Sequence, residues 1–393
     1  MIPSFSTPVR EANKAAMRLS WSSAFTLIEM LVGVAVMALI MTLLFQVFSG
    51  TTDIWKNTTS KVGSFQSARA AFESISRNLS QSTLQVYLGY ADSSGAPVPL
   101  FNPSFKLPAG MGRNQIPTQY LRGSELHFVA GPTSDVFGDA GVSGLTATGQ
   151  CVFFQAPLGF VYDELYKPYE GLVTCGGYYL ELIDTKDLQP SFISSQRGYR
   201  SCLVEVLQPA ENNAIYDSTN ALNANAPVAD SNYDLQWLRS AMSSKKSRHV
   251  VAENIILLVF LPKLAPIDEK ARNNGNADGT FLAPSYAYDS RSWESGYSGD
   301  GKVAPYTRNQ LPPLVEVVMV ALDERSAGRL AEKYGAQAPL SALGMASAFR
   351  DPAALHGPSG DLAALETRLQ SENLTYRVFR SDVQIEGAKW SDD

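Results

Sequence analysis

The stretch that decides the architecture is "SAFTLIEMLVGVAVMALIMTLLFQVFSG", residues 23–50. From Phe25 to Phe48 it holds a single charged residue, Glu29. A helix of this length reaches roughly 36 Å, enough to cross a hydrocarbon layer of about 30 Å. A secretory signal has a shorter apolar region and a small-residue cleavage site after it, and a buried core helix is not normally apolar on every face. The run therefore predicts a membrane-spanning helix.

The carboxylate of Glu29 is out of place in such a helix. A charge at the bilayer centre costs on the order of 2.5–3.5 kcal/mol on insertion scales, and an intramembrane charge usually marks a partner. A plain single-span anchor is the alternative, and it gives this carboxylate no role. We therefore take Glu29 as a candidate interaction residue.

Charge sets the expected orientation of the span. Arg10, Lys14 and Arg18 precede it with only Glu11 against them, so the N-terminus is expected on the cytoplasmic side and the body outside. The whole chain has a formal net charge of −6. Because nucleic-acid binding normally shows as a basic face, this acidic balance argues against a nucleic-acid partner.

The motif "AFTLIE", residues 24–29, resembles the processing site of type IV prepilins and of the pseudopilins of type II secretion. The resemblance implies that prepilin peptidase cuts between Ala24 and Phe25, methylates the new amine and removes residues 1–24 as a leader peptide. It also implies that Glu29 pairs with the N-terminal amine of another subunit during assembly. Two departures from the family are the Ala24 that replaces the usual Gly and the long leader.

The helix is expected to continue beyond the membrane, because no proline occurs between Phe25 and Pro97. We divide it into a transmembrane half, residues 25–48, and an amphipathic half, residues 49–82, which packs on a sheet. The second half is recognised by apolar residues spaced by three, four and seven. They are Ile54, Trp55, Val62, Phe65, Ala68, Phe72, Ile75 and Leu79.

Residues 83–393 are expected to form a β-rich globular domain with long loops, so that the fold class is α+β. The β-branched and aromatic content of seven segments predicts antiparallel strands. Short helices are expected near 233–242 and 360–371, and exposed loops at 210–232 and 272–303. The expected strands are 125–131, 150–156, 177–183, 201–207, 250–262, 314–322 and 375–385.

A second resemblance lies in this body. "AENIILLVFLPK", then Trp293, then "LPPLVEVVMVALDE" is similar in order to the J-type minor pseudopilins and the PilW-like minor pilins. "LAPSYAYDSRSWESG" and the end "YRVFRSDVQIEGAKW" look closer still to the Verru_Chthon cassette protein C family. These likenesses imply a pilin-like fold with an enlarged body.

The function that the two resemblances imply is that of a minor subunit in a type IV pilus or a type II secretion-like complex. The implied location is the cytoplasmic (inner) membrane, with one span and an external body. The implied partners are prepilin peptidase, other prepilin-like subunits and the inner-membrane assembly machinery. The alternative is a membrane-anchored adhesion or ligand-binding module that uses the pilin signal only for export.

Signals of catalysis are weak. We find no glycine-rich phosphate loop, no His-Glu-x-x-His and no Gly-x-Ser-x-Gly, so the sequence favours a protein that is not an enzyme and needs no cofactor. His127, His249 and His356 lie far apart in the sequence, which does not favour a shared metal site.

Two weaker site candidates remain. Cys151, Cys175 and Cys202 are expected in or beside strands on an oxidising side of the membrane, where one disulfide and one free thiol, or three buried thiols, are the alternatives. "NNGNADGT" spaces Asn274, Asn276 and Asp278 like ligands of a calcium loop. The acid expected near position 285 is missing, so a turn-rich loop is the favoured interpretation.

The segment "SSKKSRH", residues 243–249, is basic and enters a strand. Lysines at a strand edge discourage pairing between molecules, so we interpret the cluster as a solvated edge. Binding to DNA or to an acidic partner is the alternative.

Overall fold

The structure is a computed structural model that describes residues 26–91, 97–98, 119–124, 126–169, 171–184, 198–213, 235–291 and 309–389. The chain divides into two units, Met1–Thr58 and Thr59–Asp393. Helix α1 contributes to both.

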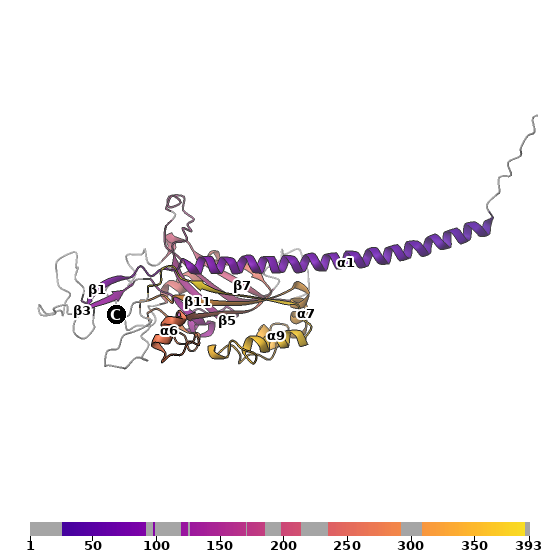
Figure 1. Ribbon diagram of the computed structural model, residues 1–393. Coiled ribbons are helices and arrows are strands. Elements are labelled where there is room, and N and C mark those ends of the chain that lie inside the picture. The colour runs from indigo at the N-terminus through magenta and orange to yellow at the C-terminus, as the bar shows by residue number, and fades with distance from the viewer. Residues whose placement is uncertain are drawn as a thin grey trace, which may run out of the picture. The chain divides into compact units, whose positions relative to one another are not determined.

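Helix α1 comprises 54 residues, Leu27–Ser80, which confirms the predicted long N-terminal helix (Figure 1). Its polar residues do not interrupt the backbone ladder. The hydroxyls of Thr42, Thr51 and Thr52 each donate to the carbonyl four residues earlier, at 2.8 Å. This bond satisfies the hydroxyl within the helix, so threonine is tolerated in an apolar run.

The larger of the two main sheets has six strands in the order β10-β4-β5-β6-β7-β8, and all neighbours are antiparallel. Its strands cover the predicted segments 150–156, 177–183 and 201–207, whereas the segment 125–131 begins its strand only at Val129. The strands are β4 (Val129–Pro132), β5 (Ala147–Ala156), β6 (Thr174–Asp184), β7 (Tyr199–Gln208), β8 (Arg248–Glu253) and β10 (Tyr288–Asp289).

A second antiparallel sheet has the order β12-β11-β9, formed by Tyr376–Gln384, Leu314–Leu322 and Ile255–Lys263. A third, small sheet has the order β2-β1-β3, formed by Pro97–Val98, Tyr87–Ala91 and Gln119–Gly123. The α+β class with antiparallel sheet is confirmed.

The predicted strand 250–262 is wrong as one element. It consists of β8 in the six-stranded sheet and β9 in the three-stranded sheet, separated by Asn254. Asn254 has φ +64°, a left-handed conformation that asparagine adopts more readily than most residues. One residue therefore carries the chain from one sheet to the next.

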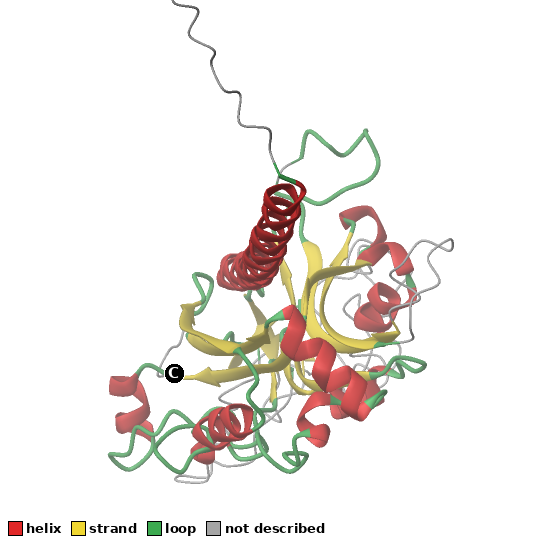
Figure 2. Cartoon of the chain, turned by 90° about the vertical axis from the view of Figure 1, so that its right-hand side faces the viewer, coloured by secondary structure: helices red, strands yellow, loops and turns green. Residues whose placement is uncertain are grey.

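Three buried clusters explain the layers. The first joins the second half of α1 (Ala68, Phe72, Ile75 and Leu79 among its residues) to one face of both main sheets. The second lies on the other face of the six-stranded sheet, under α2 and α5, and the third lies on the other face of the three-stranded sheet. The strands are thus covered by helices on both faces (Figures 1 and 2).

The predicted helices near 233–242 and 360–371 correspond to α5 (Gln236–Ser243) and α9 (Asp361–Ser371). Four others were not predicted, because tertiary packing rather than a long periodic pattern defines them. Asp323 caps one of these, since its side chain accepts a hydrogen bond from the Ser326 N–H. They are α2 (Thr133–Ala140), α6 (Pro266–Arg272), α7 (Glu324–Tyr334) and α8 (Pro339–Ala342).

Candidate functional site

The start of α1 is a capping box. The Thr26 N–H and hydroxyl both donate to Glu29 Oε2 at 3.0 Å, and the Glu29 N–H donates to the Thr26 hydroxyl at 3.3 Å. Such a reciprocal pair satisfies backbone donors that a helix N-terminus leaves free, and it places a negative charge at the positive end of the helix dipole. Glu29 therefore has a local structural role within its own chain.

The carboxylate of Glu29 contacts Thr26 and no cation among the described residues. Ala24 and Phe25, the predicted processing residues, lie outside the described residues, so the cleavage site stays a prediction. The carboxylate sits in the first turn of the helix, next to the position where the predicted cut creates an amine.

The segment that follows is apolar and uncovered. Leu27–Thr52 is 26 residues long, has a mean hydropathy of 2.5 in its most apolar window and buries none of that window in the chain itself. By length and composition it can cross a membrane, although a signal sequence near the N-terminus satisfies the same criterion. Leu39 and Phe45, for example, are exposed.

The second half of α1 is attached to the sheets by a polar contact as well as by its apolar face. Asn78 Nδ2 donates to Tyr178 Oη at 2.8 Å and to Glu205 Oε1 at 3.3 Å. Tyr178 Oη donates to the same Glu205 oxygen at 2.6 Å, and the two residues are opposite each other in β6 and β7. Burial and the neighbouring Glu205 carboxylate raise the pKa of Tyr178, so this phenol stays protonated near neutral pH.

A charged cluster surrounds Asn254, the residue at which the chain passes from one sheet to the next. Its side chain donates to Glu324 at 2.9 Å and accepts from Arg200 at 3.3 Å. Arg200 on β7 forms a two-pronged contact with Glu324 and also reaches Glu253 at 3.1 Å. The hydrogen bond with Arg200 is the main cause that lowers the pKa of Glu324. The "ENI" segment of the second resemblance therefore lies where two sheets and α7 meet.

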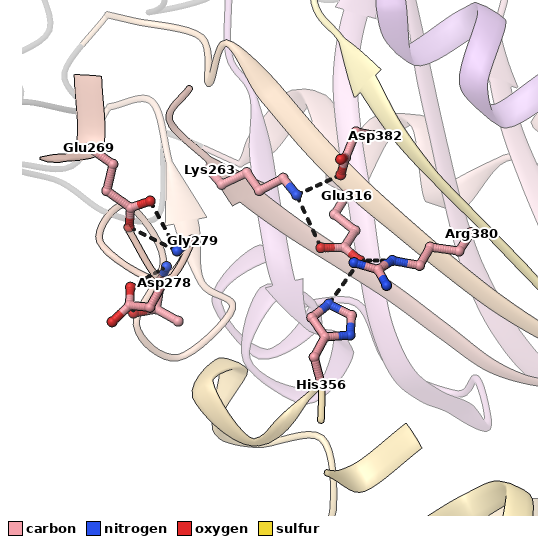
Figure 3. A network of polar contacts seen from close by, with 9 residues as sticks. Lys263, Glu269, Asp278, Gly279, Glu316, His356, Arg380 and Asp382 are labelled. Carbon is pink, nitrogen blue, oxygen red and sulfur yellow. Dashed lines mark hydrogen bonds and ion pairs between the residues drawn. The ribbon is translucent and has the colours of Figure 1, made fainter. Parts of the chain in front are cut away.

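A second charged network surrounds Glu316, which lies in the middle strand β11 and is 2% exposed (Figure 3). Lys263 Nζ lies 3.2 Å away, Arg380 Nε 2.5 Å and His356 Nε2 2.9 Å. Lys263 also pairs with Asp382 at 2.6 Å. The network thus joins β9, β11 and β12 to the segment before α9.

The charge balance of this network fixes the state of Glu316. Burial raises its pKa, but the charges of Lys263, His356 and Arg380 outweigh burial, so the net pKa is lowered. The carboxylate therefore stays ionised at neutral pH. It stabilises the sheet above the ordinary carboxylate pKa, and that contribution is lost as the pH falls through the lowered value.

The histidines do not form a common site. His127 is buried, where Nδ1 accepts from the Trp237 indole at 3.1 Å and Nε2 lies 2.6 Å from Asp289 Oδ1. His249 is exposed on the edge strand β8, and His356 belongs to the Glu316 network. In the part of the chain that the structure describes, no group of three or more His, Cys, Asp or Glu side chains could hold a metal.

The three cysteines are buried free thiols. Cys151, Cys175 and Cys202 lie on β5, β6 and β7, and Cys175 is opposite Gln155, four residues from Cys151. At about 3.3 Å per residue this offset is roughly 13 Å, beyond the reach of a disulfide. Burial raises the pKa of all three thiols, that of Cys202 to about 12. Cys175 is also opposite Gln208, six residues from Cys202, so a disulfide of Cys175 with either of the other two thiols would require the sheet to change its register.

The calcium-loop candidate is a turn held by hydrogen bonds within the chain (Figure 3). The Asp278 carboxylate accepts from the Thr280 hydroxyl at 2.8 Å and from its N–H at 3.0 Å, and these bonds lower the pKa of Asp278. Glu269 on α6 accepts from the N–H groups of Gly279 and Phe281. Asn274 has φ +49° and Asn276 follows in the same turn.

The basic segment 243–249 forms the end of α5, a short 3-10 helix and the first residues of β8, which is an edge strand. Lys245 and Lys246 are exposed there. Their place agrees with the interpretation as a solvated edge.

The sequence contained signals for the polar networks that we did not use. Glu316 is the only charged residue in the apolar strand 314–322, and a lone charge in such a strand needs buried partners. The partners themselves could not be predicted, because Lys263, His356 and Arg380 are brought together only by the pairing of distant strands.

No family model, curated protein or solved structure matches this chain. The resemblance to prepilin-like proteins therefore rests on the N-terminal motif and on the order of the elements. A long apolar N-terminal helix followed by antiparallel sheet is consistent with a pilin-like protein.

Proposed function

We propose that this chain is a prepilin-like minor subunit of a type IV pilus or type II secretion-like complex. In this proposal prepilin peptidase cuts between Ala24 and Phe25 and methylates the new amine. The mature subunit is held in the cytoplasmic membrane by Leu27–Thr52, with its body outside. It joins other prepilin-like subunits with the help of the inner-membrane assembly machinery.

The observation that carries the proposal is the position of Glu29. Its carboxylate lies in the first turn of an exposed apolar helix and has no cationic partner among the described residues. An isolated charge in lipid is costly, whereas a charge that meets an opposite charge is tolerated. The new amine of a neighbouring subunit is the opposite charge that the proposed cleavage creates.

The packing of α1 supports a division of labour along the helix. From Phe65 to Leu79 its apolar side chains pack on the chain's own sheets, so they are not free for another subunit, whereas Trp55 of the predicted apolar stripe is 71% exposed. The apolar side chains of Leu27–Thr52 have no cover in the chain itself. Lipid and the spans of neighbouring subunits are the surroundings that suit them.

The first test is the N-terminus of the mature protein. Mass spectrometry of the protein from cells with active prepilin peptidase should find a methylated Phe25 and no leader. Cells that lack the peptidase should yield the chain with Met1 retained. Retention of Met1 in both strains contradicts the proposal.

The second test separates assembly from anchoring. Glu29→Gln keeps the size of the side chain and removes its charge, so processing should continue while crosslinking to other prepilin-like subunits falls. Glu73→Gln is a matched control in the same helix, because Glu73 is exposed and pairs locally with Arg69. Equal crosslinking for both variants and the wild type would point to the export-only surface module instead.

A further inference from the structure

The basic segment 243–249 leads into β8, and β8 forms one edge of the six-stranded sheet. On one side β8 pairs with β7, where Arg248 is opposite Val206 and Glu253 is opposite Cys202. On its other side, no strand among the described residues pairs with β8. An unpaired strand edge presents N–H and C=O groups that can bind a further strand.

The residues of this edge are accessible. His249 is exposed, Val250 is 40% exposed, and Val251 is only partly buried. The strand contains no proline, and at about 3.3 Å per residue its six residues span roughly 20 Å. An extended segment of about the same length from another molecule can therefore run alongside β8.

The charges differ between the two ends of this edge. Lys245 and Lys246, just before β8, are exposed and form no ion pair among the described residues. Glu253 at the other end is exposed and pairs with Arg200 at 3.1 Å. All neighbours in this sheet are antiparallel. A further antiparallel strand therefore has positive charge beside its carboxyl end and a carboxylate beside its amino end.

These charges select the partner. Lysines at an edge discourage indiscriminate strand pairing, whereas opposite charges across two strands stabilise a pair and like charges oppose it. A strand with acidic residues at its carboxyl end places them beside Lys245 and Lys246. A nucleic acid fits less well, because it brings phosphates to both ends of an edge that carries Glu253, on a chain with a net charge of −6.

We propose that β8 binds an extended segment of a partner protein, which adds a strand to the sheet and places acidic residues at its carboxyl end beside Lys245 and Lys246. The backbone of the segment pairs with the outer edge of β8, and a β-branched side chain lies beside Val250. This interaction goes beyond the proposed assembly role of Glu29, because none of its residues belongs to α1. Its test requires neither cleavage nor assembly, so the two proposals can fail separately.

The heptapeptide amide Thr-Val-Thr-Val-Thr-Glu-Glu, labelled with fluorescein at its amino end, is a probe of this class. Two control peptides separate charge from orientation, since one has both glutamates replaced by lysine and the other has the reversed sequence. Fluorescence anisotropy with the full chain in phosphatidylcholine nanodiscs, with empty nanodiscs subtracted, should give at least tenfold tighter binding for the acidic probe than for either control. An affinity for either control equal to that for the probe, or no saturable binding of the probe, overturns the proposal.

N-methylation tests strand pairing itself. In an extended peptide, alternate residues direct their N–H groups to opposite sides, so methylation of one alternate set blocks pairing with β8 and methylation of the other set does not. One of the two methylated peptides should therefore bind at least tenfold more weakly than the probe, while the other keeps the affinity of the probe. Equal binding by both shows attraction by charge alone and contradicts the proposal.

Charge reversal locates the edge that binds. Lys246→Glu should weaken the acidic probe about tenfold and strengthen the lysine peptide, because it reverses an exposed charge beside β8. Arg377→Glu is the matched control, since Arg377 is exposed on β12, the edge strand of the three-stranded sheet, and it should leave both affinities unchanged. A loss for Arg377→Glu and none for Lys246→Glu places the peptide at the other edge and contradicts the proposal. Displacement of the probe by a single-stranded DNA oligonucleotide at lower concentration than by unlabelled probe makes the cluster a nucleic-acid site and also contradicts it.

Discussion

The two halves of α1 have similar secondary structure and opposite surroundings. In the first half Leu39 is 62% exposed, and the rest of the apolar segment is equally uncovered. In the second half Ile75 and Leu79 are 0% exposed, packed on both main sheets. One continuous helix thus carries apolar residues that the chain covers and apolar residues that it leaves for another environment.

This difference shows why hydrophobicity alone does not assign a role to a helical segment. The first half is apolar on all faces, which suits a surrounding that is apolar on all sides. The second half has one apolar face, with Arg69 and Glu73 exposed on another. The pattern around the helix, not the total apolar content, distinguishes the two surroundings.

The largest effect on stability is expected when a buried side chain in the second half of α1 is shortened. Leu79→Ala removes a fully buried side chain from the first cluster, so it should lower the free energy of unfolding by about 3 kcal/mol. Leu39→Ala leaves no cavity in the chain and should have no effect on the body. Urea denaturation of the full chain in nanodiscs, followed by near-ultraviolet circular dichroism, measures both. Equal losses would contradict the division of α1.

For membrane attachment, a substitution in the first half of α1 is expected to matter and one in the second half is not. Leu39→Asp places a carboxylate in the middle of the apolar segment and should cost about 3 kcal/mol of insertion free energy. Ala70→Asp introduces the same charge at an exposed position of the second half and should be neutral. The fraction of protein that stays with membranes after alkaline extraction should fall only for Leu39→Asp. An unchanged fraction would indicate that this segment does not anchor the chain.

The polar contact between α1 and the sheet gives the next smaller effect. Asn78→Ala removes the donor to Tyr178 and Glu205, so stability should fall by about 1–2 kcal/mol. Arg77→Ala, one residue earlier and exposed, should change stability by less than about 0.5 kcal/mol. The same urea titration measures the loss of stability in both variants. A larger loss for Arg77→Ala than for Asn78→Ala would contradict the role of Asn78 in holding α1 on the sheet.

Because of Tyr178, the attachment of α1 to the sheet is expected to weaken at alkaline pH. Burial, with the adjacent Glu205, raises its pKa above the ordinary value of 10.0. A raised pKa contributes stability below the unfolded value, and this contribution is lost as pH rises, by about 1.4 kcal/mol for each unit above pH 10. Tyr178→Phe should lose less stability than the wild type between pH 9 and pH 11. Parallel pH profiles would contradict the prediction.

Sequence patterns predicted the elements whose residues carry their own signal. The apolar run and the absence of proline defined α1 almost to the residue, and β11 matches the predicted segment 314–322. The segment 250–262 failed because its apolar residues continue on both sides of Asn254, so composition gave no sign of a change of sheet. Only the positive φ and the contacts with Arg200 and Glu324 mark that point.

The candidate site divides in the same way. Glu29 was visible as a lone charge, whereas its capping box with Thr26, three residues before it, was not predicted. The Glu316 network was not visible, because Lys263, His356 and Arg380 come from segments that lie far apart in the chain. Local signals can be read along the chain, whereas a network of this kind depends on tertiary packing.

The smallest effect concerns the capping box and separates the local role of Glu29 from its proposed role between subunits. Thr26→Val removes the hydroxyl that bonds to Glu29 and should cost about 1 kcal/mol of local helix stability. Amide exchange from Leu27 to Met30 should rise about fivefold, with no change in the body. Thr42→Val is the control, because the Thr42 hydroxyl bonds to the Ala38 carbonyl, and it should not alter exchange at the helix start.

If Glu29 acts only as a cap, Thr26→Val and Glu29→Gln should reduce crosslinking to other subunits equally. If its charge pairs with an incoming amine, Glu29→Gln should reduce crosslinking far more, because Thr26→Val keeps the carboxylate.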